Sequence, residues 1–185
     1  MIFAGRAGLQ LKAMAAASAL LAIAACFVPP DIEAPPLEEN VGPVIEQSKV
    51  DPQGPLIYID DSCVQRFTVG GIVDANTSDT IYYRWYVDYQ AWDPGRVNES
   101  GTIPPPAIPE MGRAGPSFTL YASSSTLLQN RSNGSVHTLE FVAADRPFVE
   151  DSSVAPAYKV ISEGGFGASF EWTVVIKSDE CAKQP

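Results

Sequence analysis

The stretch at residues 81–89, with the sequence IYYRWYVDY, alternates with a period of two. Its odd positions are all aliphatic or aromatic, whereas Arg84 and Asp88 fall on the opposite face. Such alternation is typical of a β-strand that buries one face. The side chains expected to point into a core are Ile81, Tyr83, Trp85, Val87 and Tyr89.

The same pattern recurs later in the chain, at residues 137–143 and 170–176. The second of these places Phe170, Trp172, Val174 and Ile176 on one face. Weaker strands are expected at 56–60, 63–73, 117–122 and 157–161, with turn signals at 74–79, 93–95, 133–134 and 164–165. About seven short strands without a convincing amphipathic helix indicate an all-β protein, most simply an antiparallel β-sandwich.

Two segments are too long for minimal turns, residues 91–116 and residues 145–168. Loops beyond about 12–15 residues are usually functional or disordered. We therefore expect any binding surface to involve one of these two loops.

The first 25 residues form a separate, non-globular segment. Arg6 and Lys12 precede an uncharged, largely apolar run at 13–25. This is the layout of a secretory signal peptide, and the run is shorter than the roughly 20 residues needed to span a bilayer. The sequence therefore predicts export and removal of residues 1–25.

The run ends in Ile23-Ala24-Ala25-Cys26, which resembles the lipobox of bacterial lipoproteins. The resemblance implies cleavage before Cys26, a diacylglyceryl thioether on its sulfur and usually a further acyl chain on the new amine. Several chains anchor a protein stably where one binds only marginally. Phe27, in place of Asp, resembles lipoproteins sent to the outer membrane.

The cysteine count agrees with this interpretation. The chain has three cysteines, Cys26, Cys63 and Cys181, and an odd count in an exported protein calls for an explanation. If Cys26 carries lipid, Cys63 and Cys181 can pair in an oxidising compartment. That disulfide would be worth on the order of 4–5 kcal/mol in the chain-entropy description.

Residues 26–55 have the composition of a tether. After Cys26 they contain seven prolines and six acidic residues against the single basic residue Lys49. Proline and like charges extend a chain, so a disordered spacer is expected. The predicted organisation is a signal peptide at 1–25, a lipidated tether at 26–55 and a β-sandwich domain at 56–185.

Net charge excludes one class of partner. Without Arg6 and Lys12, ten Lys and Arg stand against 22 Asp and Glu, which gives −12 (10 − 22). Nucleic-acid binding depends on clustered positive charge. We therefore expect no nucleic-acid partner.

Two segments of the β region resemble the PKD-like and related Ig-like modules of bacterial envelope proteins. They are Tyr83-Arg84-Trp85 and residues 137–145. The resemblance implies an Ig-like antiparallel β-sandwich. A Cys63–Cys181 bridge would clasp the ends of the sheets, unlike the disulfide that crosses the core in antibody domains.

Catalytic chemistry is not expected. His137 is the only histidine, and no partner for it is evident in the sequence, whereas hydrolytic triads and most zinc sites require histidine. We expect no enzyme activity, no metal and no cofactor.

A candidate binding surface lies on the outer face of the 81–89 strand. Tyr82, Arg84 and Tyr86 fall there, with Trp92 just beyond, and Tyr, Trp and Arg are enriched in recognition hot spots. The alternative is that these side chains pack under the 91–116 loop.

Together these features predict a lipid-anchored protein of the bacterial cell envelope. We expect a non-catalytic binding or scaffold module whose partner is an envelope protein or a glycan. The alternatives are a structural subunit of a larger envelope complex and an enzyme acting on envelope polysaccharide through paired carboxylates.

The anchor can be tested by the intact mass of the protein extracted from membranes. We expect a chain that begins at Cys26 and carries acyl groups, with a further mass change on reduction if Cys63 and Cys181 are paired. Cys26→Ser should leave the membrane fraction, because the acidic mature chain is not attracted to an anionic membrane surface. A Cys26→Ser protein that stays in that fraction would contradict the anchor.

Overall fold

A computed structural model describes residues 39–60, 63–91, 97–108, 112–122, 128, 132–151, 153–154, 156 and 158–177. Within them the chain forms ten β-strands and one short 3-10 helix, η1 (Gln47–Lys49). The all-β prediction is thus confirmed. No helix in this part of the chain has the length and apolarity needed to cross a membrane.

The larger sheet has five strands in the order β3-β10-β9-β6-β7. Their bounds are β3 Leu56–Ile59, β6 Ile81–Val87, β7 Glu99–Ile103, β9 Val136–Ala144 and β10 Gly167–Ile176. Neighbouring strands are antiparallel except β3 and β10, which pair in parallel. The expectation of a wholly antiparallel arrangement is therefore wrong at this pairing, where two segments distant in sequence meet without a hairpin.

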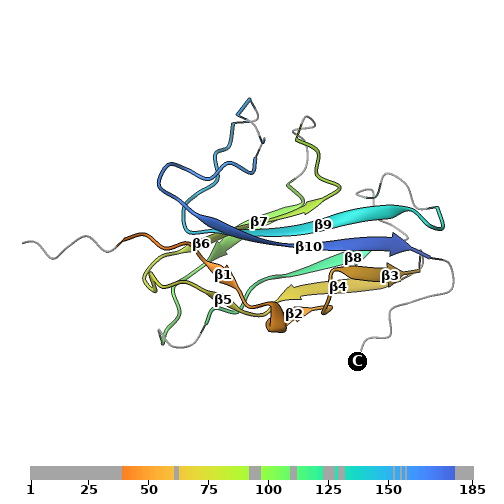
Figure 1. Cartoon of the computed structure of the whole chain (residues 1–185), viewed down its shortest axis with the longest axis horizontal. Helices are drawn as coiled ribbons and strands as arrows, with labels where there is room; N and C mark the ends of the chain where they lie inside the picture. Colours follow the sequence, from red (N-terminus) through yellow and green to blue (C-terminus); the bar gives the residue numbers. More distant parts are fainter. Residues whose placement is uncertain are drawn as a thin grey trace, which may run out of the picture. The chain divides into compact units, whose positions relative to one another are not determined.

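The second sheet has three strands in the order β2-β4-β8. These are β2 (Val50–Asp51), β4 (Val64–Val69) and β8 (Ser117–Tyr121), all antiparallel. A two-stranded sheet joins β1 (Val44–Ile45) to β5 (Ile72–Val73). In Figure 1, β9 and β10 run above β4 and β8.

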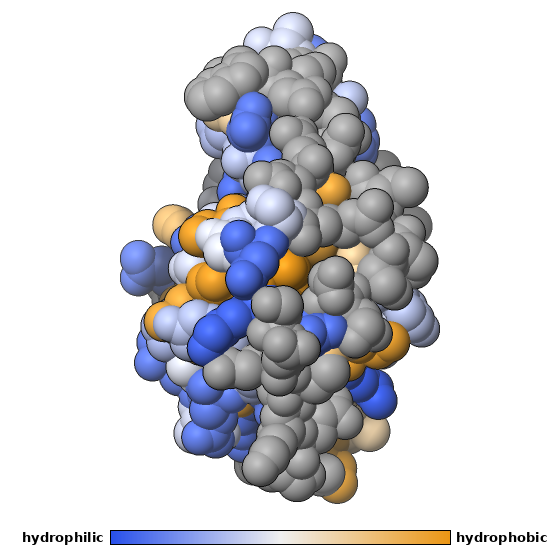
Figure 2. Space-filling view, turned by 90° about the vertical axis from the view of Figure 1, so that its right-hand side faces the viewer, coloured by the Kyte–Doolittle hydropathy of each residue, from blue (hydrophilic) through white to orange (hydrophobic). Residues whose placement is uncertain are grey.

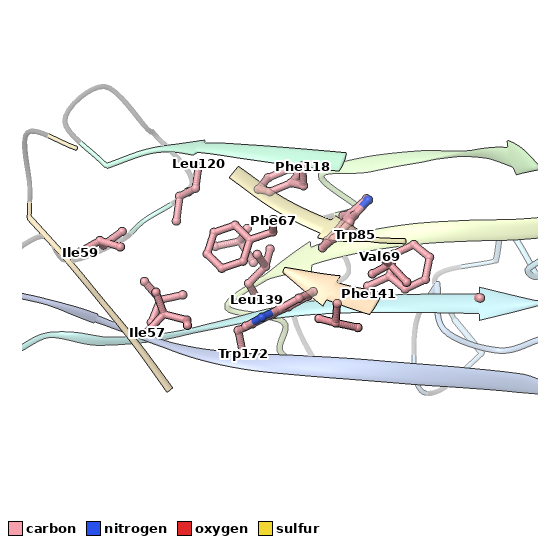
Figure 3. Close-up of a cluster of buried hydrophobic side chains, with 14 of the residues drawn as sticks. Ile57, Ile59, Phe67, Val69, Trp85, Phe118, Leu120, Leu139, Phe141 and Trp172 are labelled. Atoms are coloured by element: carbon pink, nitrogen blue, oxygen red, sulfur yellow. The ribbon is translucent and has the colours of Figure 1, made fainter. Parts of the chain in front are cut away.

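Large aromatic side chains join the two main sheets. Trp85 of β6 stacks on Phe118 of β8 with ring centroids 5.4 Å apart, and Phe67 of β4 meets Trp172 of β10 edge-on at 5.2 Å. Figure 3 shows these rings in one cluster with aliphatic side chains of both sheets. Trp85 also stacks on Trp172 within the larger sheet, at 5.8 Å, so the two contacts between the sheets belong to one continuous core.

The inward faces agree with the sequence pattern in most positions. Ile81, Trp85 and Val87 are buried in this core, as are alternate residues of β9 and β10. Tyr89 differs, since it lies beyond the end of β6 and packs with Tyr86 on the opposite side of the sheet.

One expected loop contains a strand, and one expected strand is absent. Residues 99–103 form the edge strand β7, inside the segment expected to be the 91–116 loop. There Gly101 lies opposite Tyr83, and an added Cβ would come within 2.7 Å of the Tyr83 Oη, so a larger residue here would require the Tyr83 ring to move. The expected strand at 157–161 is absent from its described residues, where Ile161 forms only an isolated bridge with Phe148.

The boundary of the tether also differs from the prediction. The compact unit begins at Glu39, and β1, η1 and β2 all lie between residue 39 and residue 55. Val50 is only 1% exposed, and Asn40 Nδ2 donates to Asp145 Oδ2 at 2.7 Å. Proline-rich, acidic composition hid these short strands because their pairing partners lie far along the sequence. Residues 1–38, with Cys26, lie outside the described residues.

Phe67→Ala should reveal how much the shared core contributes. Phe67 is fully buried, so its truncation should lower the free energy of unfolding by about 3–5 kcal/mol. Denaturant unfolding of the mature chain measures this. Thr119→Ala, at an exposed position on β8, is the control and should stay within about 0.5 kcal/mol. Equal stability of the two variants would contradict the proposed role of the core.

Candidate functional site

The candidate surface on the outer face of β6 is not exposed. Arg84 is 5% exposed and Tyr86 is fully buried, while Tyr82 is half-buried. Trp92 lies outside the described residues. The hypothesis of an aromatic recognition surface therefore fails at Arg84 and Tyr86, because a ligand cannot reach them.

The cover is a segment that follows β9. Arg84 Nη1 donates to the carbonyl oxygen of Tyr158 at 2.8 Å, and the Tyr86 hydroxyl donates to the same oxygen at 2.6 Å. Tyr158 has a positive φ of 59°, a conformation that a bulky residue adopts only when its surroundings hold it there. Two convergent donors provide that restraint.

Ion pairs and ring contacts complete this cover. Arg84 pairs with Glu150, and Lys159 pairs with Glu140 of β9. The ammonium of Lys159 also lies 3.8 Å from the centre of the Tyr89 ring. We call Arg84, Tyr86, Glu150, Tyr158 and Lys159 the outer-face clasp.

The clasp keeps its phenol uncharged. Burial is the main cause that raises the pKa of Tyr86 far above its ordinary value, so its hydroxyl remains a donor even in alkaline solution, where an exposed tyrosine ionises. The sequence alternative, packing under a loop, is therefore right in kind. In the described part of the chain the polar contacts of this cover come from residues 148–161, and Val97 of the 91–116 segment packs against the same cluster.

A second polar cluster lies where β6 ends and β9 begins. His137 Nδ1 lies 2.7 Å from Asp88 Oδ2, and His137 Nε2 lies 3.1 Å from the Oγ of Ser135. Asp88 Oδ1 accepts a further hydrogen bond from the Thr138 N–H at 3.0 Å. His137 is 4% exposed, and Ser135 is half-buried.

His137 therefore has partners that were not evident in the sequence. Ser135 lies two positions earlier, immediately before β9 begins. Asp88 comes from 49 positions earlier and is brought close by the pairing of β6 with β9, in which Val87 lies opposite Leu139. The Ser-x-His spacing was visible in the sequence, but the pairing of His137 with the Asp88 carboxylate was not.

Two adjoining hollows lie beside η1 and β2, with volumes of about 530 and 480 Å³. They share Ser48 and Gln53, and we call them together the Gln53 groove. Their other lining residues are Gln47, Lys49, Val50, Asp51, Pro52, Gly54, Pro55, Phe170 and Glu171. The Trp172 Nε1 donates to the carbonyl oxygen of Pro52 at 3.0 Å, so the core fixes one wall of the groove.

An apolar strip crosses the outer face of the larger sheet at its β3 end. Register places Tyr58, Val175 and Val136 side by side on three strands. Tyr58 is 43% and Val136 62% exposed, and Leu56 on the same face of β3 is 50% exposed. Figure 2 views the unit from the right-hand side of Figure 1 and shows hydrophobic residues reaching the surface between hydrophilic ones.

Of the three cysteines with a predicted role, only Cys63 lies within the described residues. Cys63 precedes β4, is 7% exposed and is disulfide-bonded. Cys181 and Cys26 lie outside the described residues, so the identity of its partner stays a prediction. Among the described residues, no three His, Cys, Asp or Glu side chains lie close enough to hold a metal ion.

No protein-family model, no curated protein and no solved structure matches this chain. Its function therefore has to be inferred from its own residues and their contacts.

The clasp can be tested with Tyr86→Phe, which removes the hydroxyl and keeps the ring. Loss of one hydrogen bond should cost about 1 kcal/mol. Within the cover, the Val149 N–H donates to the carbonyl oxygen of Val160 and the Ser162 N–H donates to that of Pro147. Hydrogen exchange of these two amides should therefore accelerate about fivefold. Tyr121→Phe, at an exposed position, is the control, and unchanged exchange in Tyr86→Phe would contradict the clasp.

Proposed function

We propose that this chain is a lipid-anchored module of the bacterial cell envelope that acts by binding an envelope protein or a glycan. The carrying observation is the apolar run that ends in Ile23-Ala24-Ala25-Cys26. A disulfide between Cys63 and Cys181 fits the same oxidising compartment. Phe27 after the anchor favours the outer membrane.

The folded unit works close to the lipid surface. Only residues 27–38 separate Cys26 from the start of the unit at Glu39. A fully extended chain spans at most about 3.3–3.6 Å per residue, so these twelve residues reach roughly 40 Å at most. The spacer of 26–55 first expected would reach more than twice as far.

We also propose that the two main sheets form an Ig-like sandwich. Its support is the packing of two sheets across a core centred on Trp85 and Trp172. The parallel pairing of β3 with β10 is a departure from the all-antiparallel pattern of these modules.

The Gln53 groove is the surface that we propose for the partner. Its volume is in the range of ligand pockets, and its walls combine amides of Gln47 and Gln53 with the partly exposed ring of Phe170. Amides and aromatic rings suit both a glycan and an extended peptide. This groove replaces the outer face of β6, which the clasp closes.

The apolar strip favours the second candidate, a structural subunit of a larger complex. Exposed, contiguous apolar residues such as Tyr58 and Val136 are typical of surfaces that pack against another protein. Co-migration of the native protein in a large detergent-stable complex, lost on Val136→Lys, would establish this role.

Photo-crosslinking in intact cells tests the groove directly. A photo-reactive amino acid in place of Gln53 or Glu171 should give a crosslinked adduct, and the same amino acid in place of Thr119, an exposed residue of β8 that does not line the groove, should not. Adducts at both groove positions would support the proposal. Their absence, or equal adducts at Thr119, would contradict it.

A further inference from the structure

We propose that Ser135 is a nucleophile activated by His137 and Asp88, and that it accepts acyl groups from activated esters or thioesters. This activity goes beyond the proposed binding function and does not rest on it. It replaces the sequence expectation of a non-catalytic chain, which depended on a histidine without partners.

Each imidazole nitrogen of His137 has the partner that a nucleophilic serine site requires. In nucleophilic serine sites, one imidazole nitrogen faces the hydroxyl and the other faces a carboxylate that fixes the tautomer. Here Nε2 of His137 lies 3.1 Å from the Ser135 Oγ, and Nδ1 lies 2.7 Å from Asp88 Oδ2. Both distances are within the hydrogen-bond reach that nucleophile and base require.

Asp88 is itself held in place. Its Oδ1 accepts from the Thr138 N–H, and its own N–H donates to the Thr138 carbonyl at 2.9 Å. Its φ of 49° is positive, which is uncommon for a residue other than glycine. Two hydrogen bonds with Thr138 therefore hold this conformation and orient the carboxylate toward His137.

A purely structural role is the competing explanation. The Asp88–His137 bond fastens the end of β6 to the start of β9, and this function needs nothing on Nε2. The Ser135 hydroxyl nevertheless lies against Nε2. Ser135 is half-buried and follows three exposed residues, 132–134. Its reactivity separates the two explanations.

Local backbone donors limit the substrate class. The Ser135 N–H donates to the carbonyl oxygen of Ser132 at 2.9 Å, and the Gly134 N–H donates to the carbonyl oxygen of Ile176 at 2.7 Å. Neither is available to an oxyanion, and the loss of one such donor costs a factor of about 10²–10³ in rate. Amides are therefore poor substrates, whereas aryl esters and thioesters, whose leaving groups depart readily, are suitable.

The reaction balances without a cofactor. Ser135 Oγ adds to the carbonyl carbon while its proton passes to His137 Nε2. The carbon–oxygen or carbon–sulfur bond then breaks, and the leaving group takes that proton. Water later attacks the acyl-serine by the same route, which releases the acid and restores the hydroxyl, while Asp88 keeps the imidazole oriented.

A fluorophosphonate probe tests the proposal on the mature chain. Ser135 Oγ should displace fluoride from phosphorus, giving one covalent adduct that peptide mapping places on Ser135. Ser135→Ala should abolish labelling, and His137→Gln should slow it by a factor of about 10² or more, in the range of general-base contributions. Ser132→Ala, at an exposed serine nearby, is the control and should label like wild type.

Two results would overturn the proposal. One is labelling of the wild-type chain no faster than that of Ser135→Ala, and the other is a His137→Gln variant that labels at the wild-type rate. If His137→Gln is unfolded by circular dichroism, the release of p-nitrophenol from p-nitrophenyl acetate by the wild-type chain replaces it as the test. Release no faster than that by Ser135→Ala would then equally exclude the activity, whatever the crosslinking of the Gln53 groove shows.

Discussion

Four aromatic side chains, Phe67, Trp85, Phe118 and Trp172, hold the two main sheets face to face, and the positions of the remaining elements follow from this contact. Such rings bury more apolar area than any other side chains. They therefore fix which face of β6 and β10 points inward. Because side chains alternate along a strand, the same contact also fixes which residues point outward.

The polar clusters follow from that register. With Trp85 inside, Arg84 and Tyr86 must face outward, where the segment after β9 covers them and both donate to Tyr158. Where β6 ends, the pairing that sets Val87 opposite Leu139 brings Asp88 beside His137. A slip of one residue would separate that pair and expose Trp85, so core and cluster depend on one alignment.

The chain shows two ways in which composition misleads. Proline and acidic residues concealed β1 and β2, since strands of two residues carry no readable alternation and gain their stability from partners distant in sequence. Tyr82, Arg84 and Tyr86 had the composition of a binding surface, but polar residues on an outer strand face can equally hold down a covering segment.

Local sequence determined the all-β class, the main strands and the inward positions of Ile81, Trp85 and Val87, because period-two alternation is a property of the chain itself. It also carries the whole case for the anchor at Cys26, a motif of contiguous residues. Only the tertiary structure decided what covers β6 and which carboxylate faces His137. Those contacts join residues dozens of positions apart, and their pairing is set by the packing of the sheets rather than by any local pattern.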